Sequence, residues 1–229
     1  MSKYLNLFKT KAEADAAVYD KNNTPNVSYC EEDESVKYTE KIVPPHLEAT
    51  FVDLGLPSGL KWAKANLGAE NETDPGLYYM WGDTEGHAKD SGYDFSNNNY
   101  TSNGLNAISE NLSLAHDAAN VRLGGSWRMP TRTEFTELYN NTIVTWTTIN
   151  GVAGCKFANK TDASKYIFMP ASGRYRGSSL EDWGLESYYW TIQFYDSSYA
   201  YFFESASGVQ RTDFLYRYLG FSVRAVCSE

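Results

Sequence analysis

Three cysteines are the first candidates for covalent chemistry in this chain. Cys30, Cys155 and Cys227 are far apart in sequence, and their number is odd. They form neither a disulfide framework nor a Cys-x-x-Cys metal site. No paired carboxylates and no nucleophile–base motif accompany them. We therefore expect buried thiols and a protein that is not an enzyme.

One short segment has the residue types of a cation site. Asp83, Glu85 and His87 stand at alternate positions, and acidic loops of this kind bind hard cations. The segment falls in a polar stretch that we expect to be a solvated loop, and no second cluster of ligands appears. We therefore predict no metal ion and no cofactor.

The last quarter of the chain, residues 166–229, differs in composition from the rest. The first 165 residues contain seventeen Asn and twelve Lys, whereas the last 64 contain neither, and hold nine of the eighteen Tyr and six of the eleven Phe. A Tyr-rich sheet would explain the aromatic residues but not the missing Asn and Lys. Tyr and Ser suit contact surfaces, where Lys is depleted. We interpret the segment as a recognition surface built on strands.

Charge and hydropathy narrow the possible partners. The formal net charge of −9 leaves no basic stripe for phosphates, so we expect no nucleic acid and no anionic membrane surface as partner. No apolar run approaches the length of a membrane span, and the first residues lack the apolar core of a signal peptide. We expect synthesis in the cytoplasm, followed by association with a virion or another form of display.

The hydrophobic pattern predicts two parts. Residues 1–46 are predicted to form a small helix–hairpin element, in which an Ala-rich helix over 11–18 precedes two alternating runs, 26–30 and 36–38. A lone hairpin is marginally stable, so this element should pack on a partner or on the main domain. Residues 47–229 form that domain.

Within the main domain, the pattern predicts two helices beside many short, mostly antiparallel strands, which is an α+β domain. Helices are expected over 114–123 and after Thr131, which forms a capping box with Glu134. The stretches 83–112 and 205–219 are predicted to be loops. Strands are expected within residues 51–62, 76–82, 144–148, 152–157, 166–169, 188–194, 199–204 and 221–226.

Two stretches near the start of this domain resemble known families. Residues 51–63, with Tyr79-Met-Trp-Gly, resemble the opening of a paralogous surface-domain family of gut-type bacteria and their phages. Gly124-Gly-Ser-Trp-Arg-Met-Pro-Thr-Arg-Thr-Glu-Phe resembles the helix start shared with the formylglycine-generating-enzyme type of C-type lectin fold. This resemblance implies a C-type lectin-like fold. Those enzymes use a closely spaced cysteine pair, which this chain lacks.

The C-terminal motifs resemble the variable proteins of diversity-generating retroelements. They are Ser172-Gly-Arg-Tyr-Arg-Gly-Ser-Ser-Leu, Tyr189-Trp190 and Gly220-Phe-Ser-Val-Arg-Ala-Val, and the resemblance spans about residues 49–227. Trp183 and Thr191-Ile192 depart from the family's pattern. In such systems a reverse transcriptase substitutes bases at template adenines. That process would remove Asn and Lys codons together and introduce Tyr, Ser, Asp and Phe.

The same resemblance separates framework from diversified positions. The framework positions it implies are Tyr189, Trp190, Ala200, Tyr201, Gly220, Phe221, Val223 and Arg224. The diversified positions, which we expect to contact a ligand, are Glu181, Asp182, Leu185, Glu186, Tyr188, Tyr195, Asp196, Ser197, Ser198, Phe202, Glu204, Asp213, Phe214, Tyr216, Tyr218 and Leu219. Strand alternation over 200–205 supports this division, since one face must pack while the other can vary.

These observations predict a receptor-recognition protein of the phage adhesin kind, with a hypervariable binding surface on a rigid scaffold. Its ligand would be a cell-surface protein or glycan, and residues 1–46 would attach it to a larger assembly. The alternative is a structural or assembly protein whose aromatic face is a fixed subunit interface. A formylglycine-type oxidase is a third interpretation, and it would require turnover of a Cys-bearing peptide.

Overall fold

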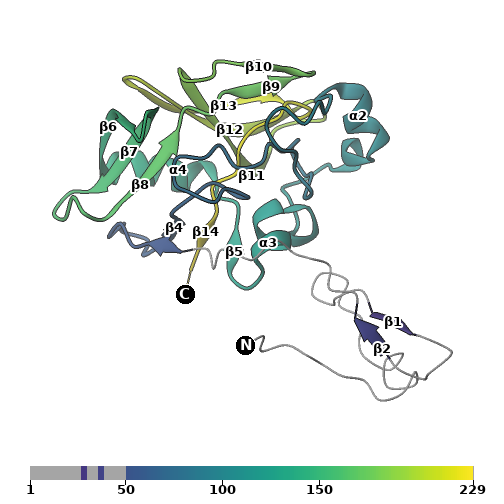
Figure 1. Cartoon of the computed structure of the whole chain (residues 1–229), viewed down its shortest axis with the longest axis horizontal. Helices are drawn as coiled ribbons and strands as arrows, with labels where there is room; N and C mark the ends of the chain where they lie inside the picture. The colour runs from purple at the N-terminus through teal and green to yellow at the C-terminus, as the bar shows by residue number, and fades with distance from the viewer. Residues whose placement is uncertain (1–26, 30–35, 39–49, 229) are drawn as a thin grey trace. The chain divides into compact units, whose positions relative to one another are not determined.

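The computed structural model describes residues 27–29, 36–38 and 50–228, and the chain divides into two units, Met1–His46 and Leu47–Glu229 (Figure 1). In the first unit, β1 (Val27–Tyr29) pairs with β2 (Val36–Tyr38) in antiparallel register, which confirms the predicted hairpin. The predicted helix over 11–18 lies outside the described residues.

The second unit is an α+β domain in which short, mostly antiparallel strands predominate over helices, as predicted. Its sheets have the strand orders β3-β4-β14-β5, β6-β7-β8, β10-β9 and β11-β12-β13. The strands are β3 (Phe51–Val52), β4 (Lys61–Ala63), β5 (Trp127–Arg128), β6 (Thr142–Ile149), β7 (Val152–Asn159), β8 (Tyr166–Pro170), β9 (Arg174–Arg176), β10 (Ser179–Glu181), β11 (Glu186–Phe194), β12 (Tyr199–Ala206), β13 (Val209–Tyr216) and β14 (Val226–Cys227). The helices are α2 (Asn97–Ser102), α3 (Ala118–Leu123) and α4 (Arg132–Asn141), with 3-10 turns η1 (Leu105–Ala107) and η2 (Leu114–His116).

The two ends of the domain meet in the four-stranded sheet. β14 lies between β4 and β5, and pairs Val226 with both Trp62 and Arg128. The fully buried Arg224 holds this region together, because its guanidinium donates hydrogen bonds to Asn66 Oδ1 and to the carbonyl oxygens of Ala63 and Phe168 at 2.7–3.0 Å. A buried charge with several hydrogen-bond partners fixes the backbone around it.

The predicted capping box begins α4. The Thr131 hydroxyl accepts the Glu134 N–H at 3.2 Å, and the Glu134 carboxylate accepts the Thr131 N–H at 2.7 Å. The same carboxylate pairs with both terminal nitrogens of Arg128 at 2.8 and 2.5 Å. Although burial acts to raise the pKa of Glu134, these hydrogen bonds outweigh it and lower that pKa below its ordinary value.

Helix α4 contacts two sheets, β6–β7 on one side and β12–β13 on the other (Figure 1). Phe135 on the helix and Phe203 on β12 join these layers, with stacked rings whose centroids are 4.4 Å apart. Both side chains are fully buried. This packing fixes the position of the β11-β12-β13 sheet relative to the rest of the domain, because close-packed cores resist small displacements.

Three predictions about the elements need correction. Residues 205–219 were predicted to be a loop, which is wrong: they contain β13, joined to β12 by a tight turn in which Gly208 has a φ of +77°. The predicted helix over 114–123 is interrupted at Asp117, whose side chain instead caps α3 by accepting the N–H groups of Ala119 and Asn120. The stretch 83–112 contains α2 and η1, whose Tyr100 and Leu105 are buried.

Two expected strands are shorter than predicted. Residues 76–82 form only single bridges, Tyr78 with His87 and Tyr79 with Phe221, and over 221–226 continuous pairing begins only at Val226. Both segments run through the core, where neighbours on all sides bury their side chains. Within the described residues, no helix combines the length and the apolar character needed to cross a membrane.

Candidate ligand-binding surface

The β12–β13 hairpin presents two chemically different faces. Its register pairs Tyr201 with Phe214 and Phe202 with Asp213, and successive side chains of a strand point to opposite faces. Phe214 and Asp213 are therefore neighbours in sequence but belong to different surfaces. The positions predicted to form one ligand-binding surface are consequently split between two.

The first surface is an aromatic cluster, which we call the aromatic surface. It consists of Tyr195, Tyr199, Tyr201, Phe214, Tyr216 and Tyr218, contributed by the ends of β11, β12 and β13 and the residues just after β13. Tyr195 and Phe214 stack at 4.0 Å with a 5° interplanar angle, Tyr199 and Tyr216 lie 4.7 Å apart, and Tyr216 stacks on Tyr218 at 5.1 Å. Tyr195, Phe214 and Tyr216 are 42%, 39% and 37% exposed. Each ring touches another, so the surface is continuous.

Hydrogen bonds hold the turn that carries the first of these rings. Asp196 Oδ1 accepts the backbone N–H groups of Ser198 and Tyr199 at 2.8 and 2.9 Å, which closes the turn between β11 and β12. The buried Arg217 donates to the carbonyl oxygens of Ser197 and Ile108 at 2.5 and 2.7 Å, and so ties the turn to the body of the domain. The backbone that carries these exposed rings is thus held in place by hydrogen bonds from Asp196 and Arg217.

The tyrosine hydroxyls of this surface also interact with each other. The pKa of Tyr199 is raised above its ordinary value, mainly by a hydrogen bond with Tyr216 and to a smaller extent by desolvation.

The second surface is charged and lies around the other face of the hairpin and the β9–β10 ribbon. We call it the charged surface; it comprises Arg174, Arg176, Glu181, Asp182, Glu186, Glu204, Arg211 and Asp213. Arg211 binds Glu204 at 2.8 Å and lies 3.5 Å from Asp213. Arg174 binds Glu181 at 3.1 Å and lies 3.4 Å from Asp182. Four of its carboxylates are thus paired with arginines of the same surface, whereas Glu186 accepts a hydrogen bond from the Tyr188 hydroxyl.

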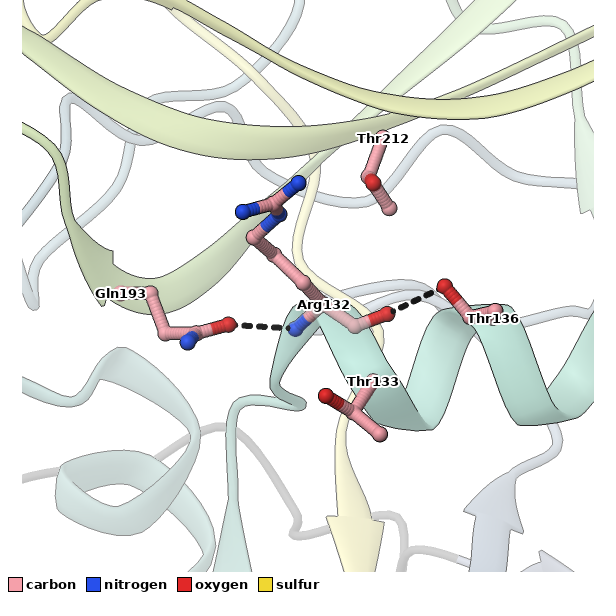
Figure 2. Close-up of a pocket in the computed structure, with 5 residues that line it drawn as sticks. All are labelled: Arg132, Thr133, Thr136, Gln193 and Thr212. Atoms are coloured by element: carbon pink, nitrogen blue, oxygen red, sulfur yellow. Dashed lines mark hydrogen bonds between the residues drawn. The ribbon is translucent and has the colours of Figure 1, made fainter.

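A shallow depression of about 310 Å³, whose lining residues are shown in Figure 2, adjoins Tyr201 of the aromatic surface. Arg132, Thr133 and Thr136 of α4 line it together with Gln193 of β11 and Thr212 of β13. Gln193 Oε1 accepts the Arg132 N–H at 2.7 Å, which fixes the start of α4 against β11. The Arg132 guanidinium lies over the ring of Tyr201, 3.9 Å from its centroid.

The positions expected to contact a ligand differ in their exposure. Exposed are Leu185, Tyr195, Ser197, Ser198, Phe214 and Tyr216, and half-buried are Glu181, Asp182, Glu186, Asp196, Asp213 and Tyr218. The remaining positions, Tyr188, Phe202, Glu204 and Leu219, are buried.

For the buried positions, the expectation of a surface side chain is wrong. Phe202 packs edge-on against Phe221 with centroids 5.3 Å apart, and Leu219 lies in the same hydrophobic cluster. Burial, and then a hydrogen bond to Glu186, raise the pKa of Tyr188, whose hydroxyl also contacts Asp182 at 3.0 Å. Glu204 is buried beneath Arg211. Successive side chains of β11 and β12 point into two different hydrophobic clusters, one containing Tyr188 and Phe202 and the other Tyr189 and Phe203. Neither face of these strands is therefore fully exposed to solvent.

Sequence reasoning missed several residues of these surfaces. Tyr201 was assigned to the framework and Tyr199 was left out of the ligand-contacting positions, yet both belong to the aromatic surface. The alternation of Tyr199, Tyr201 and Phe203 along one strand was an available signal, because it places all three on one face. Arg132, Gln193 and Arg217 carried no such signal, since their roles depend on contacts between distant segments.

The residues considered for covalent and metal chemistry are placed as follows. Cys155 and Cys227 are both buried, and burial raises the pKa of the Cys155 thiol. His87 Nε2 lies 3.5 Å from Asp83, and its ring stacks on Tyr93 at 3.4 Å. In the described part of the chain, no group of three or more His, Cys, Asp or Glu side chains is arranged to hold a metal ion.

No protein-family model matches this sequence, and neither a curated protein nor a solved structure matches it.

Proposed function

We propose that this protein binds a macromolecular ligand through the aromatic surface, on a C-type lectin-like scaffold whose exposed positions are diversified by a retroelement. The observation that carries the proposal is the continuity of Tyr195, Tyr199, Tyr201, Phe214, Tyr216 and Tyr218 on the outside of a hairpin whose other rings are buried. Contiguous exposed aromatic patches on soluble proteins mark interaction sites.

The chemistry of the surface suits recognition. Tyr has a large amphipathic contact area and few rotatable bonds, so that ordering it on binding costs little conformational entropy. The turn at Ser197 and Ser198 adds small hydroxyls beside the rings, and both side chains are exposed. Asn and Lys are absent from the whole segment, as expected if template adenines had been substituted.

The lectin-like scaffold is part of the same proposal. The motif around Trp127-Arg-Met-Pro leads into the capping box of α4, as the resemblance implies. The motif residues Tyr189, Trp190, Phe221, Val223 and Arg224 are all buried, which suits framework positions. Tyr201 departs from this pattern, because it contributes to the aromatic surface.

Sequencing the locus in sister isolates tests the proposal, and the hairpin supplies matched controls. We expect substitutions at the exposed Tyr195, Phe214 and Tyr216, and none at the buried Phe203 and Arg217. The coding DNA should also lie near an almost identical, adenine-rich template repeat. Uniform residues at the exposed positions, with no such repeat, would instead favour the alternative of a structural or assembly protein with a fixed aromatic interface.

We also propose that residues 1–46 attach the domain to a larger assembly, such as a virion, and that the ligand is displayed on a bacterial cell surface. The division of the chain at His46 supports a separable element. Deletion of residues 1–46 should abolish association with the assembly, while the remaining domain keeps its thermal unfolding transition. Retention of assembly by the deleted chain would refute the attachment role.

A further inference from the structure

The depression beside the aromatic surface contains a cation, Arg132, whose charge no carboxylate of the described residues compensates. The two terminal nitrogens and Nε of Arg132 have no hydrogen-bond or ion-pair partner among the described residues, and Nε is shielded from solvent. The other arginines differ: Arg128, Arg174, Arg176 and Arg211 pair with carboxylates, and Arg122, Arg217 and Arg224 donate to carbonyl oxygens. In a chain with a net charge of −9, an unpaired arginine in a concave site requires a reason.

Within the described part of the chain, the Arg132 side chain is held in position by contacts that do not neutralise its charge. It extends from the start of α4 toward the strands, with Gln193 on one side and Thr212 on the other (Figure 2). The ring of Tyr201 supports one face of the guanidinium at 3.9 Å. Of the three guanidinium nitrogens, which all lack a partner among the described residues, only Nε is shielded from solvent. The two terminal nitrogens are therefore accessible from the depression. A planar guanidinium fork fixed in this way matches the two oxygens of a carboxylate.

We infer that Arg132 binds a carboxylate of the ligand, supplied by an acidic side chain of a polypeptide that lies across the aromatic surface. This inference rests on the function proposed above and specifies its ligand class. Arg132 of the depression contacts Tyr201 of the aromatic surface, so the two sites adjoin and one bound segment can contact both. The carboxylate anchors the segment, and the aromatic surface buries its neighbouring apolar side chains.

The arrangement of the rings favours a polypeptide over a glycan. A sugar ring stacks on an open aromatic face, but here one face of five of the six rings is already covered. Tyr195 and Phe214 cover one another at 4.0 Å, Tyr216 stacks on Tyr218, and the Arg132 guanidinium covers Tyr201. Rings paired in this way leave less open face for a sugar ring, and together with Arg they have the composition of protein–protein interfaces.

Selection from a random dodecapeptide display library tests the inference with the full-length chain as bait. We expect the enriched peptides to carry Asp or Glu next to apolar residues. Their affinity should fall about tenfold or more for Arg132→Gln, because a charge-assisted hydrogen bond is lost. Arg176→Gln is the matched control, since Arg176 is an exposed arginine of the charged surface, and it should bind as the parent does. A Tyr195→Ser/Phe214→Ser variant should lose binding altogether.

The outcomes separate this inference from the function on which it rests. Enriched peptides that need Tyr195 and Phe214, but contain no acidic residue and bind Arg132→Gln equally well, would overturn the inference and leave the proposed function intact. Binding to an array of acidic glycans, with no peptide enriched, would overturn the assignment to a polypeptide. Failure to bind either library would count against both. An unchanged melting profile by circular dichroism establishes that Arg132→Gln is folded.

Discussion

Phe203 and Phe214 lie in the same hairpin on the same face of the sheet, and they provide a direct test of which rings maintain the fold. Phe203 is fully buried against Phe135 and Phe157, whereas Phe214 is 39% exposed and stacks mainly on Tyr195. Replacing Phe214 by Ser imitates a change that diversification would introduce, and the same replacement at Phe203 is the comparison. If the aromatic surface is separate from the core, the two substitutions must differ greatly in cost.

The magnitudes follow from burial. Truncating a fully buried Phe costs about 3–5 kcal/mol, and a Ser hydroxyl left there without a partner adds about 1–3 kcal/mol. Phe203→Ser should therefore lose about 4–8 kcal/mol, much of the stability of an ordinary domain. Full burial of Phe is worth about 1.5–3 kcal/mol, so the partly exposed Phe214 contributes roughly 1–2 kcal/mol, and its ring pairing adds about 0.5–1.5 kcal/mol. Phe214→Ser should cost about 2 kcal/mol, because its hydroxyl is solvated.

Urea unfolding of the full chain, followed by tryptophan fluorescence, measures both free energies. Should Phe203→Ser fail to fold, Phe203→Leu and Phe214→Leu repeat the comparison with smaller changes. Equal costs at the two positions would show that Phe214 belongs to the core, and would refute the argument that the aromatic surface can vary without loss of the fold.

Other substitutions test the support of the surface and its titrating groups. Arg217→Met removes the hydrogen bonds to Ser197 and Ile108, and should lower the free energy of unfolding by about 3 kcal/mol or more. Amide hydrogen exchange in the turn at 196–199 should become faster. Unchanged exchange would contradict the anchoring role of Arg217. The lowered pKa of Glu134 means that its contribution to stability is present above its unfolded value near 4.5 and is lost as the pH falls through the folded value. Glu134→Gln should therefore melt at a lower temperature than the parent at pH 7, and the difference should shrink below about pH 4.5; a constant difference would contradict the linkage. Burial raises the pKa of the Cys155 thiol, so iodoacetamide at pH 8 should not modify Cys155 until urea unfolds the chain, as measured by mass spectrometry. Rapid labelling of the folded protein would contradict this.

Elements defined by local signals could be predicted from the sequence. The Thr131–Glu134 capping box and the Asn150-Gly151 hairpin turn each depend on residues close together in the chain, and both are present. β13 could not be separated from a loop by composition, because its residues alternate in burial without alternating cleanly in polarity. The turn at Ser207-Gly208 was the signal for this hairpin, since Gly supplies the positive φ that the turn needs.

The candidate surface could be predicted only in part, because side-chain direction depends on register. Asp213 and Phe214 were grouped together, yet they point to opposite faces. Tyr188 and Phe202 have the same composition signal as Tyr195 and Phe214, but they pack against Phe221 from inside. The aromatic enrichment of the segment therefore serves two purposes, core and surface, and the sequence does not separate them. Arg132 could not be predicted as a site residue, because its exceptional feature is that its guanidinium has no hydrogen-bond or ion-pair partner among the residues that the structure describes.

The hairpin depends far less on its exposed rings than on its buried ones for stability, and this difference is what a diversified surface requires. The inner part of β12 is held by Phe203 against α4 and by Phe202 against Phe221, on opposite faces of the same strand. The outer part is held by hydrogen bonds between side chains and the backbone: Asp196 Oδ1 accepts the Ser198 N–H within the turn, and Arg217 donates to the Ser197 carbonyl oxygen from beneath it. Neither Phe203 nor Arg217 reaches the surface, so a change at Tyr195 or Phe214 alters what a ligand meets without removing what fixes the strands. A chain that relied on the exposed rings for folding would lose stability with each new variant, since most substitutions at packed positions are destabilising.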